Sequence, residues 1–191
     1  MAEGLVRDIE RVYANRVYSL TRWRLNRLRK LGVIAAGFSG GDCVPTALLG
    51  YGQMVSDGHS VHLRAGSVRF SVGSASWSHR FKLDDGGSFL QGALPDMHVW
   101  LVQDGGPLID LSFGELAGDA VYLPDFMWTD VPATSYGAVS YVAHPYALDL
   151  LLSWLAGKQH LIEGIRRVNS KLGAILYADF IKDRRIQSST A

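Results

Sequence analysis

Residues 97–113 read MHVWLVQDGGPLIDLSF, two apolar runs on either side of a turn, and this stretch decides the fold. The Asp-Gly-Gly sequence at residues 104–106 is a strong signal for a β-hairpin, so we expect strands over residues 97–103 and 108–113. Successive side chains of a strand point to opposite faces of its sheet. The register of this hairpin therefore determines which polar side chains meet.

The two possible registers bury different sets of side chains. With an odd number of loop residues, or with one bulge, one face of the hairpin is wholly apolar. That face carries Val99, Leu101, Ile109, Leu111 and Phe113. The opposite face carries His98, Trp100, Val102, Leu108, Asp110 and Ser112. An even loop instead places Asp110 among apolar residues, where an unpaired carboxylate is costly to bury. We therefore predict the odd register, with His98 and Asp110 as direct or diagonal cross-strand neighbours.

Upstream of the hairpin, a glycine-rich segment ends in Asp42 and Cys43, the single cysteine of the chain. Pro45 fits the first turn of a helix and Asp42 has the side chain of an N-cap, so we predict a buried helix from here to about residue 54. A helix N-terminus stabilises a thiolate, and its free N–H groups can donate hydrogen bonds to an oxyanion beside the sulfur. Cys43 is therefore a candidate nucleophile.

The two ends of the chain have the pattern of helices. Apolar residues at helical spacing over residues 5–31 predict one long or two short helices that end at Gly32. The same spacing returns over residues 146–155 and 160–180, with a break near Gly157.

The middle of the chain has the pattern of an antiparallel sheet. Alternation predicts strands over residues 61–72, with a bulge or turn at Ala65 and Gly66, and one more short strand around Trp77. Residues 115–140 are expected to be mostly loop. This order of elements predicts an α+β fold in a single domain spanning residues 1–191, with the cysteine-bearing helix packed on the sheet and helices flanking it.

Composition excludes several classes of function. Of the residues, 48% are apolar and 19% are charged, which is the balance of a packed domain and not of a disordered chain. The formal net charge of +1 gives no overall field for nucleic acid, so we expect no nucleic-acid partner. No apolar run approaches the roughly 18–20 residues that span a bilayer, and charges come too early for a secretory signal. We therefore expect no membrane partner and a cytoplasmic location.

The histidines and glycines do not form a metal or phosphate motif. No two histidines have the His-x-x-x-His spacing of a helical zinc site, and His59 and His62 alone are near neighbours. Gly40 and Gly41 are not followed by the Lys-Ser or Lys-Thr of a phosphate-binding loop. We predict no metal site and no cofactor.

Cys43, His98 and Asp110 together have the residue types of a nucleophilic triad. In this hypothesis His98 takes the thiol proton of Cys43, and Asp110 fixes the tautomer of the imidazole and stabilises its cationic form. Two other carboxylates compete for the third role. Asp96 is too close in sequence to turn back onto His98, and Asp104 belongs to the turn, so we prefer Asp110.

Three short strings around these residues carry a family resemblance. They are Gly40-Gly41-Asp42-Cys43, His98-Val99-Trp100 and Ile109-Asp110-Leu111-Ser112-Phe113-Gly114. They resemble the papain-like and transglutaminase-like cysteine proteinase superfamily, and arylamine N-acetyltransferases are similar at the same three places. The resemblance spans residues 37–115. It implies the papain-like α+β fold, with Cys43 as nucleophile, His98 as base and Asp110 as the orienting residue.

The sequence departs from these families at two points. Papain-like enzymes place a glutamine before the cysteine as an oxyanion donor, and the stretch between Gly32 and Cys43 contains no glutamine or asparagine. The backbone N–H of Cys43 and either Gln91 or a loop amide are then expected to serve. Ser39 replaces an arginine or its equivalent in the acetyltransferases, which favours hydrolysis over a coenzyme A-dependent reaction.

The expected function is a cysteine-dependent hydrolase or acyltransferase, such as a peptidase, an amidase or a transglutaminase-like enzyme, that works through an acyl-enzyme. Its substrate is expected to be a peptide or a small acyl compound. The residues predicted to bind substrate are Trp100, Gln91, Gly41 and Asp42. The alternative is a non-catalytic module that holds a peptide or another ligand in the same cleft. The sequence leaves the oligomeric state open.

Overall fold

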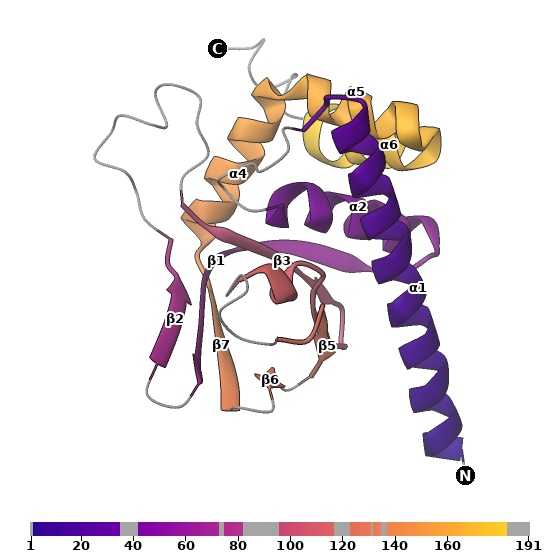
Figure 1. The fold of residues 1–191 in the computed structure, drawn as a ribbon. Helices are drawn as coiled ribbons and strands as arrows, with labels where there is room; N and C mark the ends of the chain where they lie inside the picture. The colour runs from indigo at the N-terminus through magenta and orange to yellow at the C-terminus, as the bar shows by residue number, and fades with distance from the viewer. Residues whose placement is uncertain are drawn as a thin grey trace.

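The computed structural model describes residues 2–34, 42–72, 75–81, 96–116, 123–130, 132–134 and 137–182. These residues form an α+β fold, in which a curled antiparallel sheet is flanked by helices from both ends of the chain (Figure 1). The predicted α+β class is confirmed.

Helix α1 (Ala2–Lys30) is one long helix. Gly32 follows the end of this helix, and its φ of 67° lies in the left-handed region that favours glycine. The N–H of Gly32 donates to the carbonyl of Arg29 at 3.0 Å, and the N–H of Val33 donates to the carbonyl of Leu28 at 3.0 Å. This pair of bonds is a Schellman motif, so the predicted end of the helix is confirmed.

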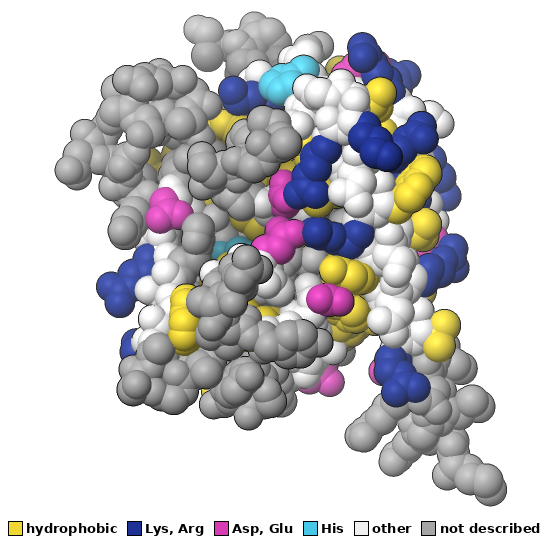
Figure 2. All heavy atoms as spheres, viewed as in Figure 1, with side chains coloured by type: hydrophobic (Ala, Val, Ile, Leu, Met, Phe, Trp, Pro, Cys, Tyr) yellow, Lys and Arg dark blue, Asp and Glu magenta, His cyan; other side chains and the backbone are white. Residues whose placement is uncertain are grey.

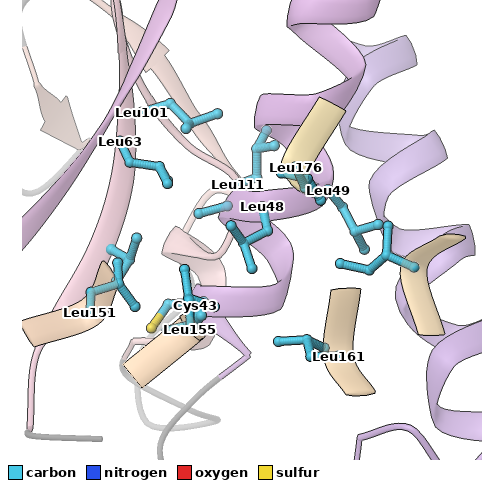
Figure 3. Packing of buried hydrophobic residues seen from close by; sticks show 14 of the residues in the cluster. Cys43, Leu48, Leu49, Leu63, Leu101, Leu111, Leu151, Leu155, Leu161 and Leu176 are labelled. Carbon is cyan, nitrogen blue, oxygen red and sulfur yellow. The ribbon is translucent and has the colours of Figure 1, made fainter. Parts of the chain in front are cut away.

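Helix α2 (Cys43–Ser56) lies at the centre of the molecule between the sheet and the other helices (Figure 1). Leu48 and Leu49 are completely buried, and Figure 3 shows them among leucines from the sheet and from the C-terminal helices. Asp42 stands at the N-cap position, but its carboxylate forms an ion pair with Arg29 of α1 and does not cap the helix. The predicted buried helix is present and extends two residues past 54.

The sheet is antiparallel at every described pairing. Its strands are β1 (Val61–Val72), β2 (Ala75–His79), β3 (His98–Gln103), β4 (Leu108–Asp110), β5 (Met127–Thr129), β6 (Ala133–Thr134) and β7 (Gly137–Ala143). The order across the sheet is β5-β4-β3-β1-β7-β6, with β2 paired to β1. A short 3-10 helix, η1 (Phe113–Glu115), follows β4.

Strand β1 runs without interruption through the position where a bulge or turn was expected, so that prediction is wrong. Gly66 marks a change of neighbour instead. Residues 61–66 pair with β3, residues 68–72 pair with β2, and residues 66–70 pair with β7. The strand therefore links two parts of the sheet.

The register of the β3–β4 hairpin agrees with the odd register. Leu101 pairs with Ile109 and Val102 pairs with Leu108, which places His98 and Asp110 on one face as diagonal neighbours. On the other face, Leu101 and Ile109 are buried under α2. The predicted apolar face is confirmed for Val99, Leu101, Ile109 and Leu111, which share the cluster under α2. It is wrong for Phe113, because β4 ends at Asp110 and Phe113, in η1, packs in a second cluster.

The long loop expected over residues 115–140 is only partly correct, because β5, β6 and the start of β7 lie in it. The second C-terminal helix is also divided. The structure has α4 (Pro145–Gly157), α5 (Gln159–Val168), α6 (Ser170–Tyr177) and a π-helical turn η3 (Ala178–Lys182). Asn169 separates α5 from α6, and its side-chain oxygen caps α6 by accepting from the N–H of Leu172 at 3.2 Å.

The two faces of the sheet are buried in two different clusters. The outer face packs under α2 together with α1 and the C-terminal helices, and it includes Val61, Leu63 and Ala65 of β1. The inner face of the curl holds a second cluster. That cluster consists of Val68, Phe70, Phe113, Leu123, Met127 and Val139. The first half of β1 thus contributes to one cluster and its second half, with Val68 and Phe70, contributes to the other cluster on the opposite face.

Candidate active site

A buried histidine and aspartate form the centre of the candidate site. Nε2 of His98, the first residue of β3, lies 2.6 Å from Oδ2 of Asp110, the last residue of β4. The His98 side chain is 2% exposed and the Asp110 side chain is fully buried. At this distance and this burial, the pair is a charge-assisted hydrogen bond shielded from water.

The Asp110 carboxylate accepts hydrogen bonds at both oxygens. Oδ1 accepts from the backbone N–H and from the hydroxyl of Ser112, each at 3.0 Å. Oδ2 accepts from the hydroxyl of Tyr141, on β7, at 2.8 Å as well as from His98. A buried carboxylate is stable only when hydrogen bonds satisfy it. The bonds from Ser112 and Tyr141 therefore stabilise the negative charge of Asp110 that pairs with His98.

The titration of the two groups follows from this network. Burial alone lowers the pKa of His98. The charge and the hydrogen bond of Asp110 outweigh burial, Cys43 contributes less through a hydrogen bond and through its own charge, and together they raise the pKa of His98 to about 10. Burial alone raises the pKa of Asp110, but the charge and hydrogen bond of His98, followed by the bonds from Tyr141 and Ser112, hold that pKa below its ordinary value. The pair is therefore an imidazolium and a carboxylate at neutral pH.

Cys43 is the first residue of α2, and its side chain is buried. The thiol donates to the backbone carbonyl of Met97 at 3.9 Å, one residue before His98. Its side chain also acts as a hydrogen-bond partner of His98. Because Nε2 of His98 is engaged with Asp110, Nδ1 is the ring nitrogen that remains for the sulfur.

Gly66 of β1 lies beside His98 in the sheet and leaves room for the neighbouring strand. It pairs with His98 on one side and with Ala143 of β7 on the other. A Cβ atom at this position would lie 2.1 Å from the carbonyl oxygen of Val142 and 3.1 Å from Cδ2 of His144. No side chain fits there, so the close approach of β7, which carries Tyr141, depends on this glycine.

The four residues predicted to bind substrate have different outcomes. Trp100 shares the face of His98 and lies against its ring, with ring centroids 6.2 Å apart and an angle of 17° between the planes. It is only 2% exposed, so it packs beside His98 and does not line an open groove. Asp42 is held by Arg29 and lines a pocket of about 110 Å³ together with Val44 and Pro45. Gly41 and Gln91 lie outside the described residues.

Tyr141 and the Arg29–Asp42 ion pair were not anticipated from the sequence. Tyr141 lies just past the segment that was expected to be mostly loop, residues 115–140. Residues 137–143 form a strand, although their alternation of apolar and polar residues is weak. The phenol of Tyr141 was the available signal, because a buried tyrosine needs a hydrogen-bond partner. Burial, followed by the charge and hydrogen bond of Asp110, raises the pKa of Tyr141, so it remains a donor.

Two further properties concern metals and membranes. Among the residues that the structure describes, no group of three or more histidine, cysteine or acidic side chains is arranged to hold a metal ion. Over the same part of the chain, no helix combines the length and the apolar character needed to cross a bilayer.

Comparison with known proteins shows a likeness of fold and no likeness of sequence family. No family model matches the sequence, and no curated protein matches it. The fold is similar to a crystal structure described as genomics APC5867, with a TM-score of 0.56 and 13% sequence identity over 81% of this chain and 78% of that one. At this identity the likeness concerns the fold alone, and it supports the arrangement of helices and sheet described above.

Proposed function

We propose that the protein is a cysteine-dependent enzyme of papain-like or transglutaminase-like architecture that transfers an acyl group through Cys43. One observation carries the proposal. The thiol at the start of a buried helix is a hydrogen-bond partner of the His98 ring. Nε2 of that ring is hydrogen-bonded to Asp110, which is buried and accepts further hydrogen bonds. A thiol, an imidazole and a carboxylate linked in this order are the parts that nucleophilic catalysis requires.

In the first half of the reaction, His98 holds the proton of the Cys43 thiol, and the resulting thiolate attacks the carbonyl carbon of an amide, ester or thioester. The C–S bond forms, and the carbonyl oxygen takes the negative charge near the N-terminal end of α2, where helix N–H groups can donate to it. When the oxyanion collapses, the bond to the leaving group breaks. His98 gives that group its proton, and an acyl-enzyme remains on Cys43.

In the second half, water or an amine attacks the acyl-enzyme. His98 accepts a proton from the attacking group, the bond between carbon and sulfur breaks, and Cys43 leaves as a thiolate that is paired again with the imidazolium. Asp110 stays ionised throughout, since its role is to orient the ring and to stabilise the positive charge on it. Water as acceptor gives a hydrolase, and an amine gives an acyltransferase.

Intact-mass spectrometry tests the proposal directly. The protein is exposed to activated esters, thioesters and peptide amides, and an adduct with the mass of the acyl group is expected on the wild type and not on Cys43→Ala. Alkylation by iodoacetamide is measured alongside, and it should stay fast well below about pH 8, where an ordinary thiol is largely protonated. In His98→Gln this rate should fall to that of an ordinary thiol. A wild type that forms no adduct and alkylates no faster than His98→Gln would refute the proposal.

A second candidate is a non-catalytic module on the same fold, which binds a peptide or other ligand. The observation that favours it is the 5% exposure of Cys43, because a structural cysteine is also a small buried side chain. The same alkylation series separates the two functions. A structural cysteine should barely react at any pH, and its reactivity should not depend on His98.

A further inference from the structure

A pocket of about 320 Å³ on the outer face of the sheet combines arginine, serine and histidine side chains with two valines, Val68 and Val142. It is formed by β1, β2 and β7 and by the residue that precedes α4. Its polar lining consists of Ser67, Arg69, Ser78, Arg80, Ser140 and His144. No carboxylate is among the lining residues that the structure describes. Figure 2 shows basic side chains at the edge of the molecule where β2 lies in Figure 1.

The sheet register explains why these side chains gather. Arg69 of β1 pairs with Ser78 of β2 on one side and with Ser140 of β7 on the other, so an arginine lies between two serines in one row across the sheet. Ser67 is two residues away on the same strand and thus on the same face. The arrangement is a feature of the strand pairing and not a chance meeting of long side chains.

His144 is held in place at the end of this pocket. Its backbone N–H donates to the carbonyl of Ala65 at 2.9 Å, its ring lies 5.5 Å from the ring of Phe81, and Nε2 is 3.5 Å from the hydroxyl of Ser67. The same hydroxyl accepts from the N–H of Phe81 at 2.9 Å. His144 also occupies the N-cap position of α4, so the positive end of a helix of 13 residues adds to the field at the pocket.

The two arginines are available to a ligand. Both are exposed, and among the described residues neither forms an ion pair with a carboxylate. Two guanidinium groups present forked donors that match the oxygens of a phosphate or a carboxylate, and serine hydroxyls supply further hydrogen bonds. Such a lining is complementary to an oxyanion.

The pocket lies farther along β1 than the residues under α2, on the sheet face opposite the side chain of His98. Val61, Leu63 and Ala65 lie on the outer face under α2, and Ser67 and Arg69 continue that same face beyond Gly66. Gly66 is also the partner of His98 in the register. The chain turns back from the end of α2 into β1, so this part of β1 passes toward the N-terminal end of α2, where Cys43 lies (Figure 1).

We propose that this pocket binds an anionic group, a carboxylate or a phosphate, of the substrate whose acyl carbon reaches Cys43. The part of the proposal that concerns the substrate rests on the proposed function, whereas anion binding by Arg69 and Arg80 does not. The substrate is accordingly an acyl compound that also carries a negative charge.

The first experiment measures anion binding without using the thiol. Inorganic phosphate and acetate are titrated in turn into the ¹⁵N-labelled protein, and the NMR signals of the amides of Ser67 and Ser140 are followed. We expect saturable shifts, with affinity reduced about tenfold in Arg69→Gln and in Arg80→Gln, since each removes a charge-assisted contact. Arg64→Gln is the matched control, because Arg64 is exposed on β1 but points to the opposite face. The tighter of the two anions identifies the class of group that the pocket takes.

Two results would contradict anion binding by this pocket. One is the absence of saturable shifts with both anions, and the other is equal affinity in Arg69→Gln, Arg80→Gln and the wild type. All three arginines are exposed, and thermal denaturation of each variant verifies that the fold is unchanged.

The second experiment links the pocket to Cys43. Iodoacetate carries a carboxylate and iodoacetamide does not, so the ratio of their alkylation rates reports the field at the thiol. We expect Arg69→Gln and Arg80→Gln to lower the iodoacetate rate several-fold and to leave the iodoacetamide rate unchanged, with Arg64→Gln like the wild type. Equal rate ratios in all variants, despite phosphate binding, would overturn the link to the substrate. Failure of both reagents to reach Cys43 would instead refute the proposed function and leave the phosphate result intact.

Discussion

Two histidine–aspartate pairs in this protein have the same geometry and opposite surroundings. His98 and Asp110 lie 2.6 Å apart, and so do His62, on β1, and Asp104, in the turn between β3 and β4. The first pair is 2% and 0% exposed, whereas the second is 50% and 57% exposed. A distance criterion alone would rank the two pairs as equals.

The difference lies in what surrounds each carboxylate. Asp110 is buried and accepts four hydrogen bonds, two of them from Ser112 and one from Tyr141. Asp104 accepts from Ser60 and His62 in contact with water. Both carboxylates have a pKa below the ordinary value, the exposed one chiefly because of the hydrogen bonds from Ser60 and His62. The direction of the pKa shift therefore does not distinguish the two pairs, whereas burial and the number of hydrogen bonds to the carboxylate do.

Replacing Asp110 by asparagine should have the largest effect. The imidazolium of His98 loses the charge that stabilises it, so we expect alkylation of Cys43 and any acyl transfer to fall by about 10²–10⁴-fold. Breaking a buried pair should also lower the free energy of unfolding by about 3–5 kcal/mol. Iodoacetamide kinetics and urea denaturation measure the two effects. A variant with wild-type alkylation kinetics would show that the buried pair has no part in activating the thiol.

The pH dependence of stability should come next in size. Native His98 keeps its proton up to a pKa of about 10, whereas an unfolded histidine releases it near pH 6.5. Between these values the native state binds more protons than the unfolded state, so stability falls as pH rises, by up to about 1.4 kcal/mol per pH unit. Below about pH 6.5 the contribution is fully present. Urea denaturation over this range tests the prediction against His98→Gln, whose curve should lack the fall. Parallel curves would contradict it.

Tyr141→Phe should have an intermediate effect. The change removes one of the four hydrogen bonds to the Asp110 charge and leaves the aromatic ring in place, so we expect a loss of about 1.5–3 kcal/mol in the free energy of unfolding. Tyr146→Phe is the control, since Tyr146 is 55% exposed on α4. Equal stability of the two variants would mean that the phenol does not support the carboxylate.

Asp104→Asn should have the smallest effect. Exposed ion pairs contribute little because water and salt screen them, so we expect no measurable change in the thermal midpoint or in the alkylation of Cys43. Differential scanning calorimetry and iodoacetamide kinetics verify both. A loss comparable to that of Asp110→Asn would erase the distinction between the two pairs.

The buried pair was predictable because a strand has a period of two. His98 and Asp110 each lie among apolar residues of a hairpin strand, and one register keeps both side chains off the apolar face. That register is the one observed, and it makes the two residues diagonal neighbours. The end of α1 was predictable for a similarly local reason, since Gly32 supplies the left-handed conformation of the cap.

The partners that come from far along the chain were not predictable. Tyr141 reaches Asp110 only because β7 pairs with β1, and short strands separated by loops give a weak signal in a sequence. Arg29 reaches Asp42 because α1 packs on α2, which local patterns do not reveal. Ala65 and Gly66 were predicted to form a bulge or a turn, whereas Gly66 lies within a continuous strand and leaves room for β7 to approach. In each case tertiary packing decided the outcome.

The strand β7 has a consequence for the order in which the protein becomes reactive during synthesis. A nascent chain that has left the ribosome as far as β3 carries the sulfur and the imidazole, but neither the carboxylate of Asp110 nor the phenol that Tyr141 supplies much later. Under the proposed function, the thiol therefore gains its catalytic partners only after most of the polypeptide has emerged and the sheet has closed.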